Sequence, residues 1–147
     1  MIPKIACSVY IVTLNCEAWL FKTLQSVQDF DEVIILDSGS TDATYAIAQQ
    51  FDNVHIEHQD WQGYAGQKSL ALAKCRNDWV LNLDGDEVLS EGLKQEIAEV
   101  IQHNQLDALI TPINDVFLGV PNSKHTKKHA KVRFFRKAKG HYDLANK

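Results

Sequence analysis

The sequence predicts a three-layer α/β/α domain whose sheet is mostly parallel with a mixed edge. Apolar, strand-like runs alternate with helical patterns through the first hundred residues, and such alternation is typical of right-handed βαβ units in a parallel sheet. After Asn104 the alternation stops and strand-like runs follow one another, which indicates the mixed edge. With 147 residues, 45% of them hydrophobic, the chain is long enough to bury one substantial core. We therefore treat residues 1–147 as a single domain.

Four apolar runs rich in β-branched residues are predicted to form parallel strands that are buried on both faces. They are residues 5–14, 33–36, 54–56 and 79–83. Three later runs are predicted to form the edge, namely residues 106–110, 113–118 and 130–135. The last of them alternates charged and apolar side chains, which is typical of a half-exposed antiparallel strand.

Four helices are predicted between the parallel strands and after them. Asn15 is expected to cap the first helix, which has Trp19, Leu20, Leu24 and Val27 on one face. The second helix follows the turn at residues 38–42 and is expected to face inward through Ala43, Ala46, Ile47 and Phe51. The third covers about residues 64–75. Ser90 is expected to cap the fourth, in which Leu93, Ile97, Val100 and Ile101 recur at helical spacing.

Cysteine usage and hydropathy favour a cytoplasmic protein. The three cysteines (Cys7, Cys16 and Cys75) are odd in number and have no CxxC spacing, so we expect reduced, mostly buried thiols. No run approaches the roughly 18 apolar residues of a membrane span, and the first residues do not resemble a signal region.

The charge of the chain is distributed unevenly. Net charge is −4, but eight of the 15 Lys and Arg lie in one segment with no acidic residue, Lys124 to Lys139. The segment comprises Lys124, Lys127, Lys128, Lys131, Arg133, Arg136, Lys137 and Lys139. It is either a solvated segment or a surface for an anion such as the inner membrane leaflet or a phosphorylated, lipid-linked acceptor. Nucleic acid is not expected, because the strongly acidic remainder of the chain would oppose it.

Polar residues follow three of the four parallel strands. In open α/β sheets, ligands bind beyond the carboxyl ends of the strands. Thr13 and Asn15 end the first strand, residues 37–40 follow the second, and Asp84, Gly85 and Asp86 follow the fourth. A carboxylate that is buried where a strand opens into a crevice needs a hydrogen-bond donor or a cation. We therefore expect these residues to line one site.

The run Asp84-Gly85-Asp86-Glu87 points to a metal–diphosphate site. Clustered carboxylates attract hard cations, and Mg²⁺ typically takes one or two carboxylates together with water and substrate phosphates. Asp86 is the better expected ligand, because Gly85 lets its side chain point outward, whereas Asp84 is placed to bridge a ribose and the metal. Glu87 is expected behind them or in solvent. The alternative is an acidic turn in which Gly85 has a positive φ.

The remaining polar positions have two interpretations each. Asp37 is expected to accept hydrogen bonds from a base or a ribose, the alternative being a cap on the turn at Gly39. Asp42 is expected in the first turn of the second helix, where its charge interacts favourably with the helix dipole. The segment 63–68 opens the third helix with glycines that allow close backbone approach, and its Lys68 is expected to reach a base or a phosphate.

Taken together, four stretches resemble family 2 glycosyltransferases of the GT-A fold, a Rossmann-like nucleotide-diphospho-sugar transferase architecture. They are residues 12–15, 36–42, 63–68 and 83–87, in matching order and spacing. The likeness is greatest to bacterial lipopolysaccharide core β-glucosyltransferases. It covers residues 5–100 well and continues more loosely through residues 132–136.

The resemblance implies that a sugar is transferred with inversion from a nucleotide diphosphate donor, by default a UDP-sugar, to a glycan or lipopolysaccharide-core acceptor. It implies nucleoside contacts for Thr13, Asn15 and Asp37. It further implies that Lys68 approaches the nucleotide, Asp84 the ribose, and Asp86 a Mn²⁺ or Mg²⁺ ion in a DXD motif. Such enzymes place the general base further along, on the acceptor side. We therefore expect the base beyond the end of this chain, which would be the donor-binding part of a longer enzyme.

Two alternatives compete with this interpretation. A sugar-nucleotide pyrophosphorylase would need a glycine-rich, basic loop at residues 15–18, where this chain is acidic and has no glycine. A non-catalytic, receiver-like α/β module with an acidic metal pocket would use Asp37 and Asp84 but would give residues 63–68 no role.

Overall fold

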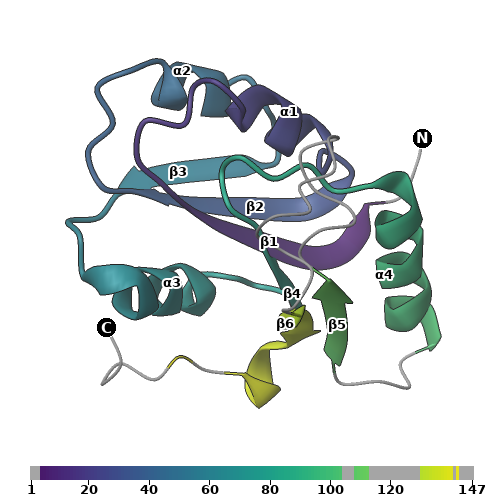
Figure 1. Cartoon of the computed structure of the whole chain (residues 1–147). Coiled ribbons are helices and arrows are strands. Elements are labelled where there is room, and N and C mark those ends of the chain that lie inside the picture. Colours follow the sequence, from purple (N-terminus) through teal and green to yellow (C-terminus); the bar gives the residue numbers. More distant parts are fainter. Residues whose placement is uncertain (1–3, 104–107, 113–129, 141, 143–147) are drawn as a thin grey trace.

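Four buried, apolar runs form the parallel half of a six-stranded sheet (Figure 1). The structure is a computed structural model that describes residues 4–103, 108–112, 130–140 and 142. The parallel strands are β1 (Ile5–Thr13), β2 (Phe30–Asp37), β3 (Val54–His58) and β4 (Trp79–Asn82). Their backbone pairs β3 with β2, β2 with β1, and β1 with β4. The predicted fold class and its four parallel strands are confirmed.

The mixed edge is formed by β5 (Ala108–Pro112) and β6 (Ala130–Arg136), followed by the short helix η1 (Lys137–Lys139). Strand β6 runs antiparallel to β4 and β5 antiparallel to β6, which gives the order β3-β2-β1-β4-β6-β5. The predicted strand at residues 113–118 lies outside the described residues.

Helices cover both faces of the sheet, and alternate residues of each strand point to opposite layers. The helices are α1 (Leu20–Gln25), α2 (Thr44–Ala48), α3 (Gly63–Ala73) and α4 (Glu91–His103). Val9 and Ile11 pack in the larger core cluster, which includes residues of α1, α2 and α4. Tyr10 packs in a second cluster with residues of α3. No helix in the described part of the chain is long and apolar enough to cross a membrane.

Two helix predictions need correction, and one is confirmed. Asn15 does not cap α1, because that helix begins at Leu20 and its N-cap residue is Trp19. Helix α2 is only five residues long, and the predicted inward residues Ala43 and Ala46 are exposed. Ser90 does cap α4: its hydroxyl oxygen accepts a hydrogen bond from the Leu93 N–H at 3.1 Å.

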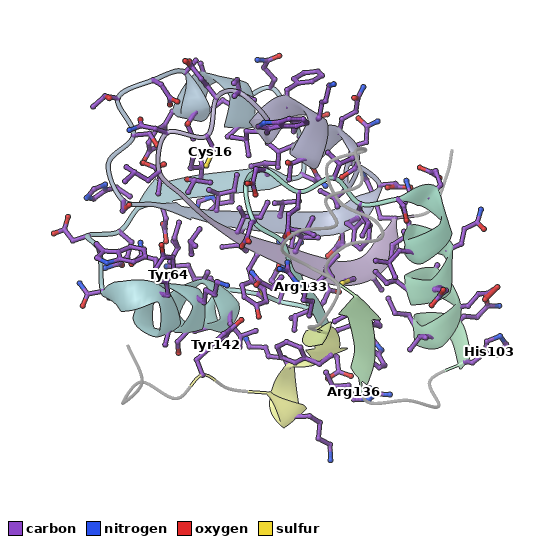
Figure 2. All side chains as sticks on the ribbon, in the orientation of Figure 1. Cys16, Tyr64, His103, Arg133, Arg136 and Tyr142 are labelled. Carbon is purple, nitrogen blue, oxygen red and sulfur yellow. The ribbon has the colours of Figure 1, made fainter. Side chains whose placement is uncertain are left out.

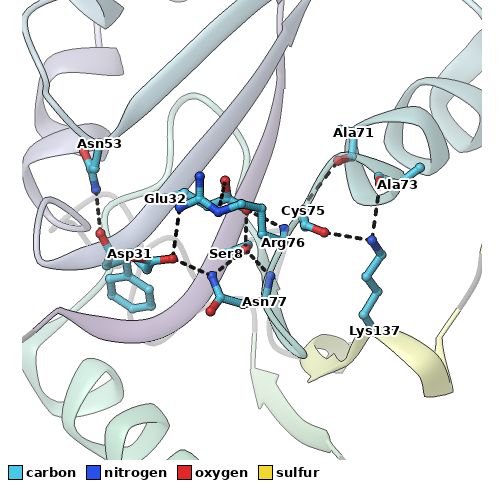
Figure 3. A network of polar contacts seen from close by, with 11 residues as sticks. Ser8, Asp31, Glu32, Asn53, Ala71, Ala73, Cys75, Arg76, Asn77 and Lys137 are labelled. Carbon is cyan, nitrogen blue, oxygen red and sulfur yellow. Dashed lines mark hydrogen bonds and ion pairs between the residues drawn. The ribbon is translucent and has the colours of Figure 1, made fainter.

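A buried polar network closes the amino-terminal end of the sheet, opposite the predicted site (Figure 3). The buried Glu32 carboxylate accepts hydrogen bonds from the Ser8 hydroxyl and from the Arg76 N–H, both at 2.6 Å. Asn77 donates to the Ser8 hydroxyl at 3.0 Å. These bonds fix the connection from α3 to β4, so the network has a structural role.

The strand order places the predicted site at a switch point of the sheet. The chain leaves β1 toward β2 and β3, then crosses back to pair β4 with the other side of β1. Backbone registers align Thr13 with Asp37 and Tyr10 with Asn82, so the carboxyl ends of β1, β2 and β4 lie close together. Open α/β sheets bind ligands in the crevice at such a point.

Candidate functional site

Asp37, at the end of β2, is fully buried and holds the turn that follows it. Its Oδ2 accepts the N–H groups of Gly39 at 2.9 Å and Ser40 at 2.7 Å. Its Oδ1 accepts the hydroxyls of Thr13 at 2.6 Å and Ser40 at 2.5 Å. Burial alone would raise the pKa of this carboxyl, but the four donors outweigh burial and hold its pKa below the usual value. The structure therefore shows the turn-capping role of Asp37.

Asn15 joins the loop after β1 to the turn after β2. Its φ of 53° lies in the left-handed region, which Asn tolerates better than most residues. Its side-chain oxygen accepts the Thr41 N–H at 2.8 Å, and its own N–H donates to the Ser40 hydroxyl oxygen at 2.7 Å. Asp42 accepts the N–H groups of Thr44 and Glu17 at 2.9 and 3.1 Å. Asp42 thus has a structural role, although it precedes α2 instead of lying in its first turn.

Behind the acidic turn after β4 lies a buried ion pair between Glu87 and Arg133. Arg133 of β6 is 3% exposed, and its Nη1 donates to Glu87 Oε1 at 2.5 Å. The same Oε1 accepts the Asp84 N–H at 2.8 Å. Burial raises the pKa of Glu87, and Arg133 partly counters that effect. Glu87 thus lies behind Asp84 and Asp86, which is one of the two positions predicted for it.

Arg133 is a site residue that the sequence does not identify, because nothing in the sequence distinguishes it from the other basic residues of the segment Lys124 to Lys139. Its Nη2 lies 3.9 Å from Asp84 Oδ2. On the other side, Lys68 Nζ lies 4.0 Å from Asp84 Oδ1. Asp84 therefore lies between two cations, each about 4 Å from one of its carboxylate oxygens, and 44% of its side chain is exposed. Both oxygens remain within reach of a ligand.

Gly85 is required for its small size. A Cβ at this position would lie 2.7 Å from Cys16 Sγ and 3.2 Å from Cys16 Cβ. In the described part of the chain only Gly39 and Gly63, among glycines, have a positive φ, so the alternative interpretation, an acidic turn with a positive φ at Gly85, is wrong. Its carbonyl accepts a hydrogen bond from the Thr23 hydroxyl at 3.2 Å. The acidic turn is thus packed directly against the loop after β1.

A cavity of about 610 Å³ opens between these elements. Its lining residues come from the end of β1 and the loop after it, the first turns of α3 and the acidic turn, namely Val12, Asn15, Cys16, Ala18, Trp19, Tyr64, Lys68, Asp84, Gly85 and Asp86. Figure 2 shows Cys16 and Tyr64 at this end of the sheet. Lys68, Asp84, Asp86 and Asn15 thus meet in one cavity, as predicted. Thr13 and Asp37 do not line it.

The donor set of this cavity suits a hard divalent cation that also binds a ligand. Asp86 is exposed and Asp84 is partly exposed, so both carboxylates can offer oxygens. No group of three or more His, Cys, Asp or Glu in the described ranges is arranged to hold a metal alone. Two carboxylates completed by water and phosphate oxygens match the usual Mg²⁺ arrangement. The residues therefore fit the expected ion.

A second cavity of about 590 Å³ lies beside the first and was not predicted. Its lining residues are Val12, Thr13, Leu14, Ser38, Trp61 and Tyr64. Trp61 and Tyr64 come from the loop before α3 and from its first turn. Two aromatic residues, Trp61 and Tyr64, at the predicted start of the third helix are the signal in the sequence that could have indicated this cavity.

Comparison with known proteins identifies the family. The model of Glycosyl transferase family 2 matches residues 8–146. The whole chain is 33% identical to the lipopolysaccharide core biosynthesis glycosyltransferase LpsC of Rhizobium meliloti (strain 1021), and the match covers 57% of LpsC. Similar solved structures include S. aureus TarS 1–349, with a TM-score of 0.64 at 23% identity, covering 90% of this chain and 47% of that one.

A further neighbour is glucosyl-3-phosphoglycerate synthase from Mycobacterium tuberculosis in complex with Mn²⁺, UDP and glucosyl-3-phosphoglycerate. It matches with a TM-score of 0.53 at 25% identity, and the match covers 65% of this chain and 39% of that one. The chain therefore spans about half the length of proteins that it resembles. Because the family model matches almost all of its residues, the chain belongs to glycosyl transferase family 2.

Proposed function

We propose that this chain binds a nucleotide diphosphate sugar, by default a UDP-sugar, together with Mn²⁺ or Mg²⁺. In the whole protein it would be the donor side of an inverting glycosyltransferase that acts on a glycan or a lipopolysaccharide-core acceptor. The observation that carries the proposal is the single cavity in which Asp84, Asp86 and Lys68 meet at the switch point of the sheet.

The polar residues at this edge of the sheet divide the proposed binding between them. Asp86 and Asp84 would hold the cation, which would supply Lewis-acid stabilisation of the charge on the diphosphate. Lys68 Nζ lies 4.0 Å from Asp84 Oδ1, so its charge is placed to attract diphosphate oxygens. Asn15 would contact the nucleoside from the loop after β1. Thr13 and Asp37 would support the site indirectly by binding each other, because the Thr13 hydroxyl donates a hydrogen bond to Asp37 at 2.6 Å.

Inverting transfer also needs a general base that removes the proton of the acceptor hydroxyl. The described carboxylates at the cavity, Asp84 and Asp86, already have the cation as their role, so we assign neither as the base. Asp115 and Asp143 lie outside the described residues. The base is expected on the acceptor side of the whole protein.

Two relatives support the donor and the acceptor class. Glucosyl-3-phosphoglycerate synthase has been crystallised with Mn²⁺ and UDP, which is the pair of ligands proposed here. LpsC is named for lipopolysaccharide core biosynthesis, which supports a lipopolysaccharide-core acceptor. A pyrophosphorylase is disfavoured, because the loop after β1 binds the turn after β2 through Asn15 and offers no basic cradle for a triphosphate.

We also propose that the enzyme works at the cytoplasmic face of an anionic membrane, through the segment from Lys124 to Lys139. Part of that segment has internal contacts: Arg133 is buried, Arg136 lies over the Trp79 ring, and Lys137 Nζ donates to the Cys75 carbonyl at 2.7 Å. Any lipid contact must therefore depend on the other basic residues of the segment. Co-sedimentation with anionic liposomes that weakens with salt would support it.

Calorimetric titration of UDP, with Mn²⁺ and with a chelator, tests the proposed donor site. We expect binding that needs Mn²⁺ and falls about tenfold or more in the Lys68→Met variant. Lys74→Met is the matched control, since Lys74 lies at the C-terminal end of α3 and pairs with Glu57 away from the cavity. Equal UDP affinity with and without metal, or equal losses in both lysine variants, would contradict the proposal.

A further inference from the structure

We propose that Trp61 and Tyr64 form the stacking wall for the nucleobase of the donor, in the second cavity of about 590 Å³. This inference rests on the proposed function and identifies the part of the chain that recognises the base. It assigns a ligand-contacting role to two aromatic residues that the motif comparison leaves without one.

The two cavities are continuous through shared lining residues. Val12 and Tyr64 line both of them. The first cavity carries the carboxylates and Lys68, which suit a cation and a diphosphate. Because Tyr64 lines both cavities, a nucleotide whose diphosphate lies in the first can extend its base past Tyr64 into the second. Both volumes fall in the usual range of small-molecule pockets.

The polar residue expected to read the base is already occupied. Asp37 is fully buried, and its two oxygens accept four hydrogen bonds from Thr13, Gly39 and Ser40. A carboxylate offers about four acceptor sites. What the second cavity presents instead is mostly apolar and aromatic surface, with Ser38 and Thr13 as its polar members. Such a wall suits the flat face of a base.

The aromatic pair is exposed, yet its loop is held firmly. Trp61 is 49% exposed and Tyr64 71%, and their rings meet edge to face with centroids 4.9 Å apart. Two large exposed aromatics side by side are typical of a binding surface. The buried Gln67 side chain accepts the Gln62 N–H at 3.1 Å and donates to the Gln59 carbonyl at 2.9 Å.

Gln67 thus fixes the loop that carries Trp61, and Gly63 permits the turn into α3 with a φ of 83°. The loop backbone is shaped before any ligand arrives, so binding a base need not order it. Stacking of a base on an aromatic side chain tolerates different bases and adds usefully to affinity. The pair therefore contributes affinity for the nucleoside, whereas the cation and Lys68 contribute affinity for the diphosphate.

The test compares UDP with pyrophosphate, each titrated in the presence of Mn²⁺, on four forms of the chain. Wild type, Trp61→Ala and Trp61→Phe are compared with Phe21→Ala, a matched control because Phe21 is 44% exposed and lines neither cavity. We expect Trp61→Ala to lose about tenfold in UDP affinity, or about 1.4 kcal/mol. Trp61→Phe should lose less than about threefold, and pyrophosphate affinity should stay unchanged in every variant.

Three results would overturn the inference: Trp61→Ala binds UDP as well as wild type does, it loses pyrophosphate affinity to the same extent, or Phe21→Ala loses as much UDP affinity. Each of these leaves the proposed donor site intact, since wild type still binds UDP with Mn²⁺. If wild type binds neither probe, the proposed function fails and the stacking wall fails with it.

Discussion

Replacing Gly85 by alanine tests the close contact between the acidic turn and the loop after β1. The new methyl would lie 2.7 Å from Cys16 Sγ, whereas non-bonded heavy atoms prefer about 3.5–4.0 Å. The sulfur must therefore move by about 1 Å. The backbone of Cys16 resists such a shift, because its N–H donates to the Thr44 hydroxyl oxygen at 2.9 Å and its carbonyl accepts the Leu20 N–H at 3.0 Å.

Overpacking of this kind costs about 1–3 kcal/mol, and we expect about 2 kcal/mol for Gly85→Ala. For a domain of this size that corresponds to a fall in Tm of about 4–8 °C. Removing the sulfur should relieve most of the cost, since the nearest remaining atom is Cys16 Cβ at 3.2 Å. We expect the double variant Cys16→Ala/Gly85→Ala to be about 1–2 kcal/mol more stable than the sum of the two single-variant effects would give.

Urea unfolding of the wild type, both single variants and the double variant measures this cycle. Gly92→Ala is the matched control, because Gly92 lies in α4 with open space around a new Cβ. Gly85→Ala as stable as wild type would refute the packing argument. So would a double variant whose destabilisation equals the sum of the single ones.

Two further predictions concern the buried charges of the site. Asp37→Ala should cost about 3 kcal/mol, because it leaves donors unpaired, and Asp37→Asn less. Because folding lowers the pKa of Asp37, its charged form stabilises the fold above the unfolded-state pKa of about 3.9, and this stabilisation is lost as pH falls through the folded-state pKa. The difference in free energy of unfolding between wild type and Asp37→Asn, measured with urea from pH 7 to pH 3, should therefore shrink as pH falls. A difference that stays constant would contradict this. Arg133→Met should cost about 3–5 kcal/mol by leaving Glu87 buried without its cation, and Glu87→Met in addition should restore much of it. The same unfolding measurements check this pair, and a double variant no more stable than Arg133→Met would count against it.

The parallel core of the fold could be predicted from the sequence because its signals are local. β1 and β2 are apolar on both faces, and α4 shows regular helical spacing beside its Ser90 cap. The meeting of Lys68, Asp84 and Asp86 also followed from a general rule, since parallel strands present their carboxyl ends at one edge. No side-chain detail was needed for that inference.

The errors arose where a partner is distant in the sequence. Asn15 resembles a helix cap, but its side chain binds N–H groups of residues 41 and 42 instead. Gly85 resembles a turn glycine, but Cys16, almost seventy residues earlier, is what excludes a side chain there. Arg133 resembles a surface charge until Glu87 is found beside it. Such pairings depend on the tertiary fold, which local patterns do not encode.

The central claim is that a divalent ion at the turn Asp84–Asp86 binds the diphosphate of the donor. Crystals grown with UDP and Mn²⁺, measured for the anomalous signal of manganese, test it most directly. We predict one manganese peak within about 2.0–2.6 Å of an Asp86 carboxylate oxygen, with diphosphate oxygens completing its ligands. A manganese ion bound elsewhere, or UDP bound outside both cavities, would contradict the account.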